Sequence, residues 1–159
     1  MSTISIPDAI PHRAPMLLLD SVHSCSADTI VCRKTFRADE PFLQGHFPNF
    51  PLVPGVILCE CAMQAGGVLI AQQAAGAAGV PVATRMDQVR FRRMVRPGET
   101  IDIEVRLRDQ VSQAYYLEAW VRCAGQVAAR LQFACTLAQV ADEPAPVDPP
   151  APGQRTDRS

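Results

Sequence analysis

The hydrophobic pattern along the chain is strand-like nearly everywhere and helical in one central stretch. Runs rich in β-branched and apolar residues predict six strands, at residues 16–22, 29–36, 82–95, 100–108, 114–123 and 126–139. The links between the later strands are short and contain Gly, Pro or polar residues, which is typical of antiparallel neighbours. In the fifth predicted strand polar and apolar positions alternate, so it should have one buried face and one more polar face.

The helical stretch is residues 56–73, which follow Pro54-Gly55, a natural place for a loop to turn into a helix. Its apolar residues occupy nearly the whole circumference, so we expect a helix buried on most sides. A membrane span is a less favoured interpretation, because Glu60, Gln64 and Gly66-Gly67 interrupt the run and no positive cluster flanks it. The two patterns together predict an α+β fold in which a mostly antiparallel sheet wraps around one long helix.

The length of 159 residues fits a single folded domain, which we expect at residues 1–140. Residues 141–159 are rich in proline, and we expect them to form a disordered tail. A net charge of −1 gives no general attraction to nucleic acid or to a membrane, so neither is an expected partner.

The six cysteines are scattered through apolar segments and are better explained as reduced core thiols than as disulfides. No C-x-x-C pair is present, so a metal site has little support. The first residues show no basic stretch followed by a long apolar run, and the expected location is the cytoplasm.

Glu60 is the most informative residue of the predicted helix, because an unpaired carboxyl in an apolar site is costly. Gln64 lies four positions later on the same face, where its amide could hold Glu60 in one orientation. The alternative is that this face simply meets solvent or a subunit boundary.

His46 lies before the helix in a segment stiffened by Pro48, Pro51 and Pro54, with Phe47 and Phe50 expected to pack around it. Rigid placement suits a catalytic imidazole. A histidine beside aromatic residues is also commonly structural, so His46 alone does not decide the function.

Taken together, these motifs resemble the FabZ-type branch of the 3-hydroxyacyl-acyl carrier protein dehydratases, which have the hot-dog fold. The resemblance spans most of residues 9–140. It rests on Pro11-His12-Arg13 with Leu17-Leu18-Leu19-Asp20, on Glu40 to Pro48, on Pro54-Gly55-Val56, on Glu60 and Gln64, and on Arg90-Phe91 through Arg96-Pro97-Gly98.

The resemblance implies a homodimer, often assembled into a trimer of dimers, in which His46 of one chain faces Glu60 of the other. Loss of the 3-hydroxyl needs a base and an acid, and we assign His46 as the base and Glu60 as the acid. Free N–H groups at the helix start, around Gly55 and Val56, would stabilise the enolate oxygen. The reaction needs no cofactor.

An arginine-rich segment at residues 90–96 suggests an acidic partner. Arg90, Arg92, Arg93 and Arg96 could dock an acidic acyl carrier protein and its phosphopantetheine phosphate, although a solvated strand surface explains them as well. His12 is interpreted mainly as an organiser of the N-terminal turn. Thr84-Arg85 and Met94 depart from the family pattern, which leaves the length and polarity of the acyl chain open.

Two other functions fit the same fold. A thioesterase would hydrolyse the substrate to a free acid, and a non-catalytic acyl-carrier-binding subunit would keep the fold without the reaction. The presence of both His46 and Glu60 favours the dehydratase.

Overall fold

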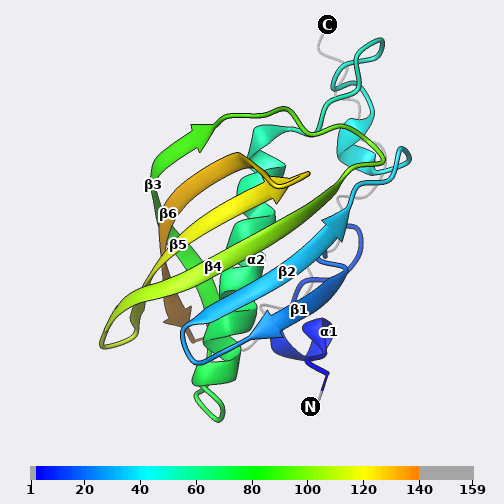
Figure 1. The fold of residues 1–159 in the computed structure, drawn as a ribbon. Helices are drawn as coiled ribbons and strands as arrows, with labels where there is room; N and C mark the ends of the chain where they lie inside the picture. The colour runs from blue at the N-terminus through cyan, green and yellow to red at the C-terminus, as the bar shows by residue number, and fades with distance from the viewer. Residues whose placement is uncertain (1–2, 140–159) are drawn as a thin grey trace, which may run out of the picture.

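One long helix, α2 (Gly55–Gln73), lies along one face of a curved six-stranded antiparallel sheet in the computed structural model, which describes residues 3–139 (Figure 1). The other elements are α1 (Ile6–Ala9), β1 (Ser21–Cys25), β2 (Thr29–Thr35), the 3-10 helix η1 (Pro41–Leu43), β3 (Val80–Phe91), β4 (Thr100–Val111), β5 (Ala114–Cys123) and β6 (Gln126–Ala138). This arrangement is the predicted α+β hot-dog architecture.

The strand order in the sheet is β1-β2-β4-β5-β6-β3, so β1 and β3 form its two edges. Tight turns join the central strands. Ala124 and Gly125, between β5 and β6, have φ angles of 48° and 75°, and two consecutive left-handed residues match the twist of a two-residue hairpin. Among residues 3–139 the strand β3 pairs only with β6, and its other side is open.

The helix α2 is buried on most sides, as its apolar circumference predicts. It is long and apolar enough to cross a membrane, but most of it is buried within the protein beneath the sheet. Gly66 allows this close packing, because a Cβ there would lie 2.7 Å from the ring of Phe133 on β6. The glycine that seemed to interrupt the apolar run is therefore a point of contact between helix and sheet.

The first predicted strand is wrong over most of its length. Residues 17–20 have no regular structure, and β1 begins only at Ser21. The reason is that the side chain of Gln64 bonds the backbone of this segment, accepting from Leu18 N–H and donating to Met16 C=O. A helix side chain thus supplies the hydrogen bonds that a neighbouring strand would otherwise provide.

The predicted third strand was placed too far along the chain, since β3 runs from Val80 to Phe91. Val95 accepts a hydrogen bond from Val53 N–H, so the end of the predicted strand pairs with the loop before α2 instead of with the sheet. The fourth strand extends to Val111, and α1 and η1 were not predicted.

All six cysteines are free thiols, as expected. Burial raises the pKa of Cys32 to about 12 and that of Cys135 to about 11, so both remain protonated core residues. The predicted tail, residues 141–159, lies outside the described residues, and the division of the chain at residue 140 stays a prediction.

Candidate active site

Glu60 lies in the second turn of α2 with its side chain 24% exposed. One of its oxygens, Oε1, accepts a hydrogen bond of 3.0 Å from Nε2 of Gln64. Gln64 is itself 1% exposed and is fixed by its bonds to Met16 and Leu18. The predicted contact between Glu60 and Gln64 therefore exists in the structure.

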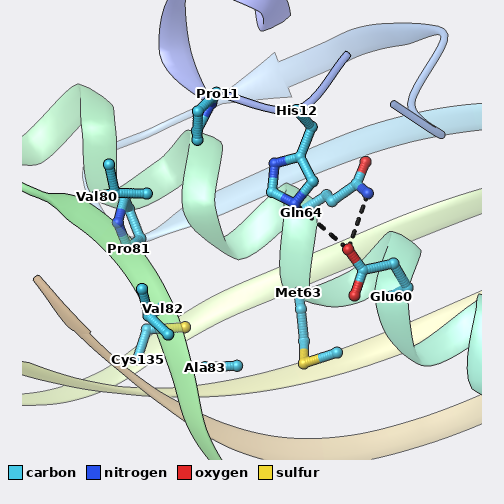
Figure 2. Close-up of a pocket in the computed structure, with 10 residues that line it drawn as sticks. All are labelled: Pro11, His12, Glu60, Met63, Gln64, Val80, Pro81, Val82, Ala83 and Cys135. Atoms are coloured by element: carbon cyan, nitrogen blue, oxygen red, sulfur yellow. Dashed lines mark hydrogen bonds and ion pairs between the residues drawn. The ribbon is translucent and has the colours of Figure 1, made fainter. Parts of the chain in front are cut away.

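His12 contacts the same oxygen of Glu60. Its Nε2 lies 3.4 Å from Oε1, so a residue of the N-terminal segment and one of the helix converge on a single atom (Figure 2). The other carboxyl oxygen, Oε2, has no hydrogen-bond partner among residues 3–139.

These side chains border a cavity of about 320 Å³, which we call the Glu60 pocket. Its lining is mostly apolar, and strand β3 supplies the wall opposite the helix (Figure 2). The lining residues are Pro11, His12, Glu60, Met63, Gln64, Val80, Pro81, Val82, Ala83 and Cys135. A carboxyl group at the edge of an apolar cavity is a common arrangement in an enzyme site for a small organic group.

His46 lies in the loop between η1 and α2, and the backbone of that loop holds its ring. Nδ1 lies 2.9 Å from the carbonyl oxygen of Leu52, while the backbone oxygen of His46 accepts from Leu52 N–H. A carbonyl oxygen can only accept, so Nδ1 carries the hydrogen and Nε2 has a free lone pair in the neutral ring. The ring can therefore act as a base through Nε2.

The expected aromatic packing around His46 is only partly present. Phe47 stacks on the imidazole with ring centroids 4.4 Å apart, but its side chain is 51% exposed. Phe50 is 46% exposed and lies beneath the guanidinium of Arg96. The loop is held by its backbone hydrogen bonds more than by aromatic burial.

The start of α2 forms a second cavity, of about 540 Å³, which we call the helix-start pocket. Gly55 and Val56 line it. Pro54 caps the helix without a side-chain hydrogen bond. Ile57 N–H donates to the Pro54 carbonyl, whereas the N–H groups of Gly55 and Val56 have no partner among the described residues and are available to a ligand. A Cβ at Gly55 would lie 2.8 Å from the Phe91 ring, which shows that this glycine allows β3 to approach the helix start.

The two candidate catalytic residues do not meet within one chain. In the part of the protein that the structure describes, no hydrogen bond or ion pair joins His46 to Glu60, and His46 does not line the Glu60 pocket. The single chain thus holds the two candidate residues in separate places, Glu60 at the Glu60 pocket and His46 in the loop before α2.

The four arginines of the predicted docking segment differ in their surroundings. Arg93 is bound to Glu99 through a contact of 2.9 Å, whereas Arg92 is exposed at the helix-start pocket. Arg90 is exposed, and exposed Arg96 lies 5.0 Å from the centre of the Phe50 ring. Arg90, Arg92 and Arg96 remain available to an acidic partner.

Thr84, Arg85 and Met94, which depart from the family pattern, do not line the Glu60 pocket, although Thr84 directly follows Ala83, which does. Arg85 is 66% exposed and forms an ion pair with Asp87, so its guanidinium points outward. Met94 lines the helix-start pocket and is 58% exposed. Thr84 bonds the backbone of β6 at Ala134. Within residues 3–139, no group of three or more His, Cys, Asp or Glu side chains is placed to hold a metal ion.

The contact of His12 with Glu60 is the feature that sequence reasoning missed. The Pro11-His12-Arg13 motif was recognised, but forty-eight positions separate His12 from Glu60 and no periodicity links them. The resemblance of that motif to a family signature was the only signal that could have suggested its place.

Comparison with known proteins gives consistent sequence matches. A family model described as ApeI dehydratase, of the ApeI-like family, matches residues 22–135. The chain is 38% identical over 121 residues to the 3-hydroxyacyl-[acyl-carrier-protein] dehydratase FabZ of Oenococcus oeni, covering 74% of this chain and 87% of that protein. It is 33% identical to FabZ of Syntrophobacter fumaroxidans, covering 90% and 98% of the two chains.

Solved structures match the fold. The dehydratase heterocomplex ApeI:P from Xenorhabdus doucetiae has a TM-score of 0.77 at 23% identity, covering 87% of this chain and 94% of that one. The PaaI protein of E. coli has a TM-score of 0.60 at 19% identity, covering 72% and 80%. A hypothetical thioesterase from Streptococcus pneumoniae reaches 0.61 at 8% identity, covering 84% and 91%. At these identities the structures establish a shared fold, and only the sequence matches separate dehydratase from thioesterase.

Proposed function

Because the chain belongs to the ApeI-like dehydratase family and has FabZ dehydratases among its relatives, we propose that it is a hydro-lyase that removes water from 3-hydroxyacyl thioesters on acyl carrier protein. The product is the trans-2-enoyl thioester, an intermediate of fatty-acid synthesis or of a related lipid or polyketide route. The observation that carries the proposal is the carboxyl group of Glu60 at an apolar pocket. Its Oε1 is contacted by Gln64 and His12, whereas its Oε2 has no partner among the described residues.

His46 is the base. The bond from Nδ1–H to the Leu52 carbonyl leaves Nε2 unprotonated, ready to take the proton from C2 of the acyl chain. The same bond stabilises the imidazolium that then forms, because the carbonyl dipole faces the new positive charge. No further residue is needed to orient the ring.

Glu60 is the acid. With Oε1 bonded by Gln64 and in contact with His12, a proton on Oε2 is directed at the departing 3-hydroxyl. As the C3–O bond breaks, that proton converts the hydroxyl into water, and the electron pair of the C2–H bond becomes the new double bond. Transfer of the C2 proton from His46 to Glu60, directly or through water, restores both residues.

The thioester oxygen gains negative charge as the C2 proton leaves. The N–H groups of Gly55 and Val56 stand at the positive end of a helix of 19 residues, where such charge is stabilised. Removal of one such donor in other enzymes costs about 10²- to 10³-fold in turnover.

The catalytic unit is a homodimer in this proposal, with His46 of one subunit completing the Glu60 pocket of the other. Two features support it. The open edge of β3 offers a row of backbone groups for pairing, and large apolar side chains are exposed beside it and at the helix start. They are Val56, Val82, Met86, Phe91 and Met94. A trimer of dimers is a further possible assembly.

The carrier protein docks through Arg90, Arg92 and Arg96, with Arg93 as a further contact when it is released from Glu99. Positive charge there attracts an acidic carrier and the phosphate of its phosphopantetheine arm. We place the reaction in the cytoplasm, where the six free thiols remain reduced.

The test is a product analysis. Purified protein incubated with 3-hydroxyacyl carrier-protein thioesters of several chain lengths should release the trans-2-enoyl thioester, detected by mass spectrometry of the carrier. Free 3-hydroxy acid would instead identify a thioesterase. Tight carrier binding without any turnover would identify a non-catalytic subunit, and either outcome would overturn the proposal.

A further inference from the structure

We propose that His12 is a positioning residue that fixes the carboxyl of Glu60, an inference that rests on the proposed function. Its Nε2 lies 3.4 Å from Oε1 of Glu60, and the His12 side chain forms part of the wall of the Glu60 pocket (Figure 2). His12 comes from the segment after α1, outside both the helix and the loop that carries His46. It is thus a third element of the site.

The unpartnered ring nitrogen of His12 indicates which tautomer is present. Nδ1 is buried and has no hydrogen-bond partner among residues 3–139. A buried N–H without an acceptor costs more than a bare lone pair in the same place, so the hydrogen belongs on Nε2. Nε2–H is then the ring N–H group that lies beside Oε1 of Glu60, in a polar contact of 3.4 Å that is longer than the 3.0 Å hydrogen bond from Gln64.

Two side chains, Gln64 and His12, therefore contact one oxygen of Glu60. Gln64 donates a hydrogen bond to Oε1, and Nε2 of His12 lies 3.4 Å from the same oxygen, which leaves Oε2 as the place for the transferable proton. Without His12, the carboxyl could rotate and exchange the roles of its two oxygens.

The N-terminal segment is built to keep His12 in place. The guanidinium of Arg13 donates to the carbonyls of Ile10 and His12, and the backbone at Met16 and Leu18 is bonded to Gln64. Through Gln64, the segment that carries His12 is thus bonded to the same face of α2 from which Glu60 projects. A purely structural role would be filled better by an apolar side chain, which would leave no buried nitrogen unpaired.

The experiment compares His12→Gln, His12→Asn and His12→Ala in the full chain. A glutamine amide can place its N–H near the position of Nε2, whereas the shorter asparagine reaches only the position of Nδ1. We expect kcat to fall about tenfold in His12→Ala and His12→Asn, the effect of one lost polar contact with Glu60, with KM little changed. His12→Gln should recover most of kcat.

Equal kcat in the glutamine and asparagine variants, or wild-type kcat in all three, would overturn the inference. The comparison of these two amides holds even where the alanine variant fails to fold. A structural role alone would lower the melting temperature of both amides and would not separate their kcat values.

A second readout is independent of activity. In the 15N NMR spectrum of wild-type protein, His12 should be the Nε2–H tautomer, and Glu60→Leu should shift its Nε2 resonance. If the proposed function is wrong, the wild-type protein will form no enoyl product, but Glu60→Leu will still shift the Nε2 resonance of His12. If only the inference about His12 is wrong, the product will form normally and His12 will be the Nδ1–H tautomer.

Discussion

The Nδ1 atom of His46 lies 2.9 Å from the carbonyl oxygen of Leu52, so the ring presents Nε2 as its free nitrogen. Replacing His46 with alanine should lower kcat by about 10² to 10⁴, the usual contribution of a general base. The melting temperature should change little, because the ring is only partly buried. Steady-state turnover on a carrier-bound substrate measures the effect.

The matched control is His23→Ala on β1, which lies outside both pockets and should keep wild-type turnover. A similar kcat in both alanine variants would remove His46 from the mechanism.

Gln64 connects the N-terminal segment to Glu60. Gln64→Ala should reduce the free energy of unfolding by about 1 to 3 kcal/mol, because Leu18 N–H and Met16 C=O lose their partner. It should also lower kcat, since Glu60 loses a donor. Denaturant unfolding and turnover measure the two effects.

Gln72→Ala, at an exposed position near the end of the same helix, should leave both quantities near wild type. If Gln64→Ala were as stable and as active as Gln72→Ala, Gln64 would have no role in holding the segment or the carboxyl.

The bonds of Glu118 on β5 to Arg108 and Arg130 should make the free energy of unfolding depend on pH. Burial raises its pKa, but hydrogen bonds from Arg130 and Arg108 lower it by more, so the pKa is held below its ordinary value of 4.5. A lowered pKa means that the stabilisation is present above 4.5 and is lost as the pH falls through the folded-state pKa. Glu118→Gln should therefore lose about 1 to 3 kcal/mol at pH 7 and almost nothing relative to wild type in strong acid.

Melting temperatures from pH 7 down to pH 3 measure this difference. The control is Asp39→Asn, which removes an exposed ion pair with Arg37 and should change stability little at any pH. A constant difference between Glu118→Gln and wild type across that range would show that the ion pairs of Glu118 do not contribute.

Arg92 should act on binding and not on chemistry. Arg92→Glu should raise KM for a carrier-bound substrate several-fold and leave KM for a short thioester without carrier unchanged, because only the carrier is acidic. The effect should shrink in high salt. Arg37→Glu, whose native side chain is 74% exposed elsewhere on the surface, is the control. An unchanged KM for the carrier-bound substrate would exclude docking at Arg92.

The fold could be predicted well from the sequence because its signals are local. The one long apolar stretch and the alternation of residues 114–123 give α2 and β5 nearly to the residue. The first predicted strand failed for a non-local reason, since the backbone of Met16 and Leu18 is bonded by a glutamine forty-six or more positions away.

The candidate site could be predicted only in part for the same reason. The pairing of Glu60 with Gln64 follows from helical spacing, whereas the contact of His12 with Glu60 arises from tertiary packing. In the proposed dimer the relation of His46 to Glu60 depends on a second subunit, so it could come only from the family resemblance and not from periodicity within one chain.

The most direct measurement of the central claim is turnover by mixed dimers. His46→Ala and Glu60→Ala should each be nearly inactive alone. If His46 and Glu60 pair between chains, a mixed dimer of the two variants has one intact site and one site that lacks both residues. Random mixing of equal amounts makes about half of the dimers mixed. The sample should therefore regain about a quarter of wild-type enoyl-thioester formation. Activity that stays at the level of the separate variants after verified subunit exchange would contradict a dehydratase site shared by His46 and Glu60 of different subunits.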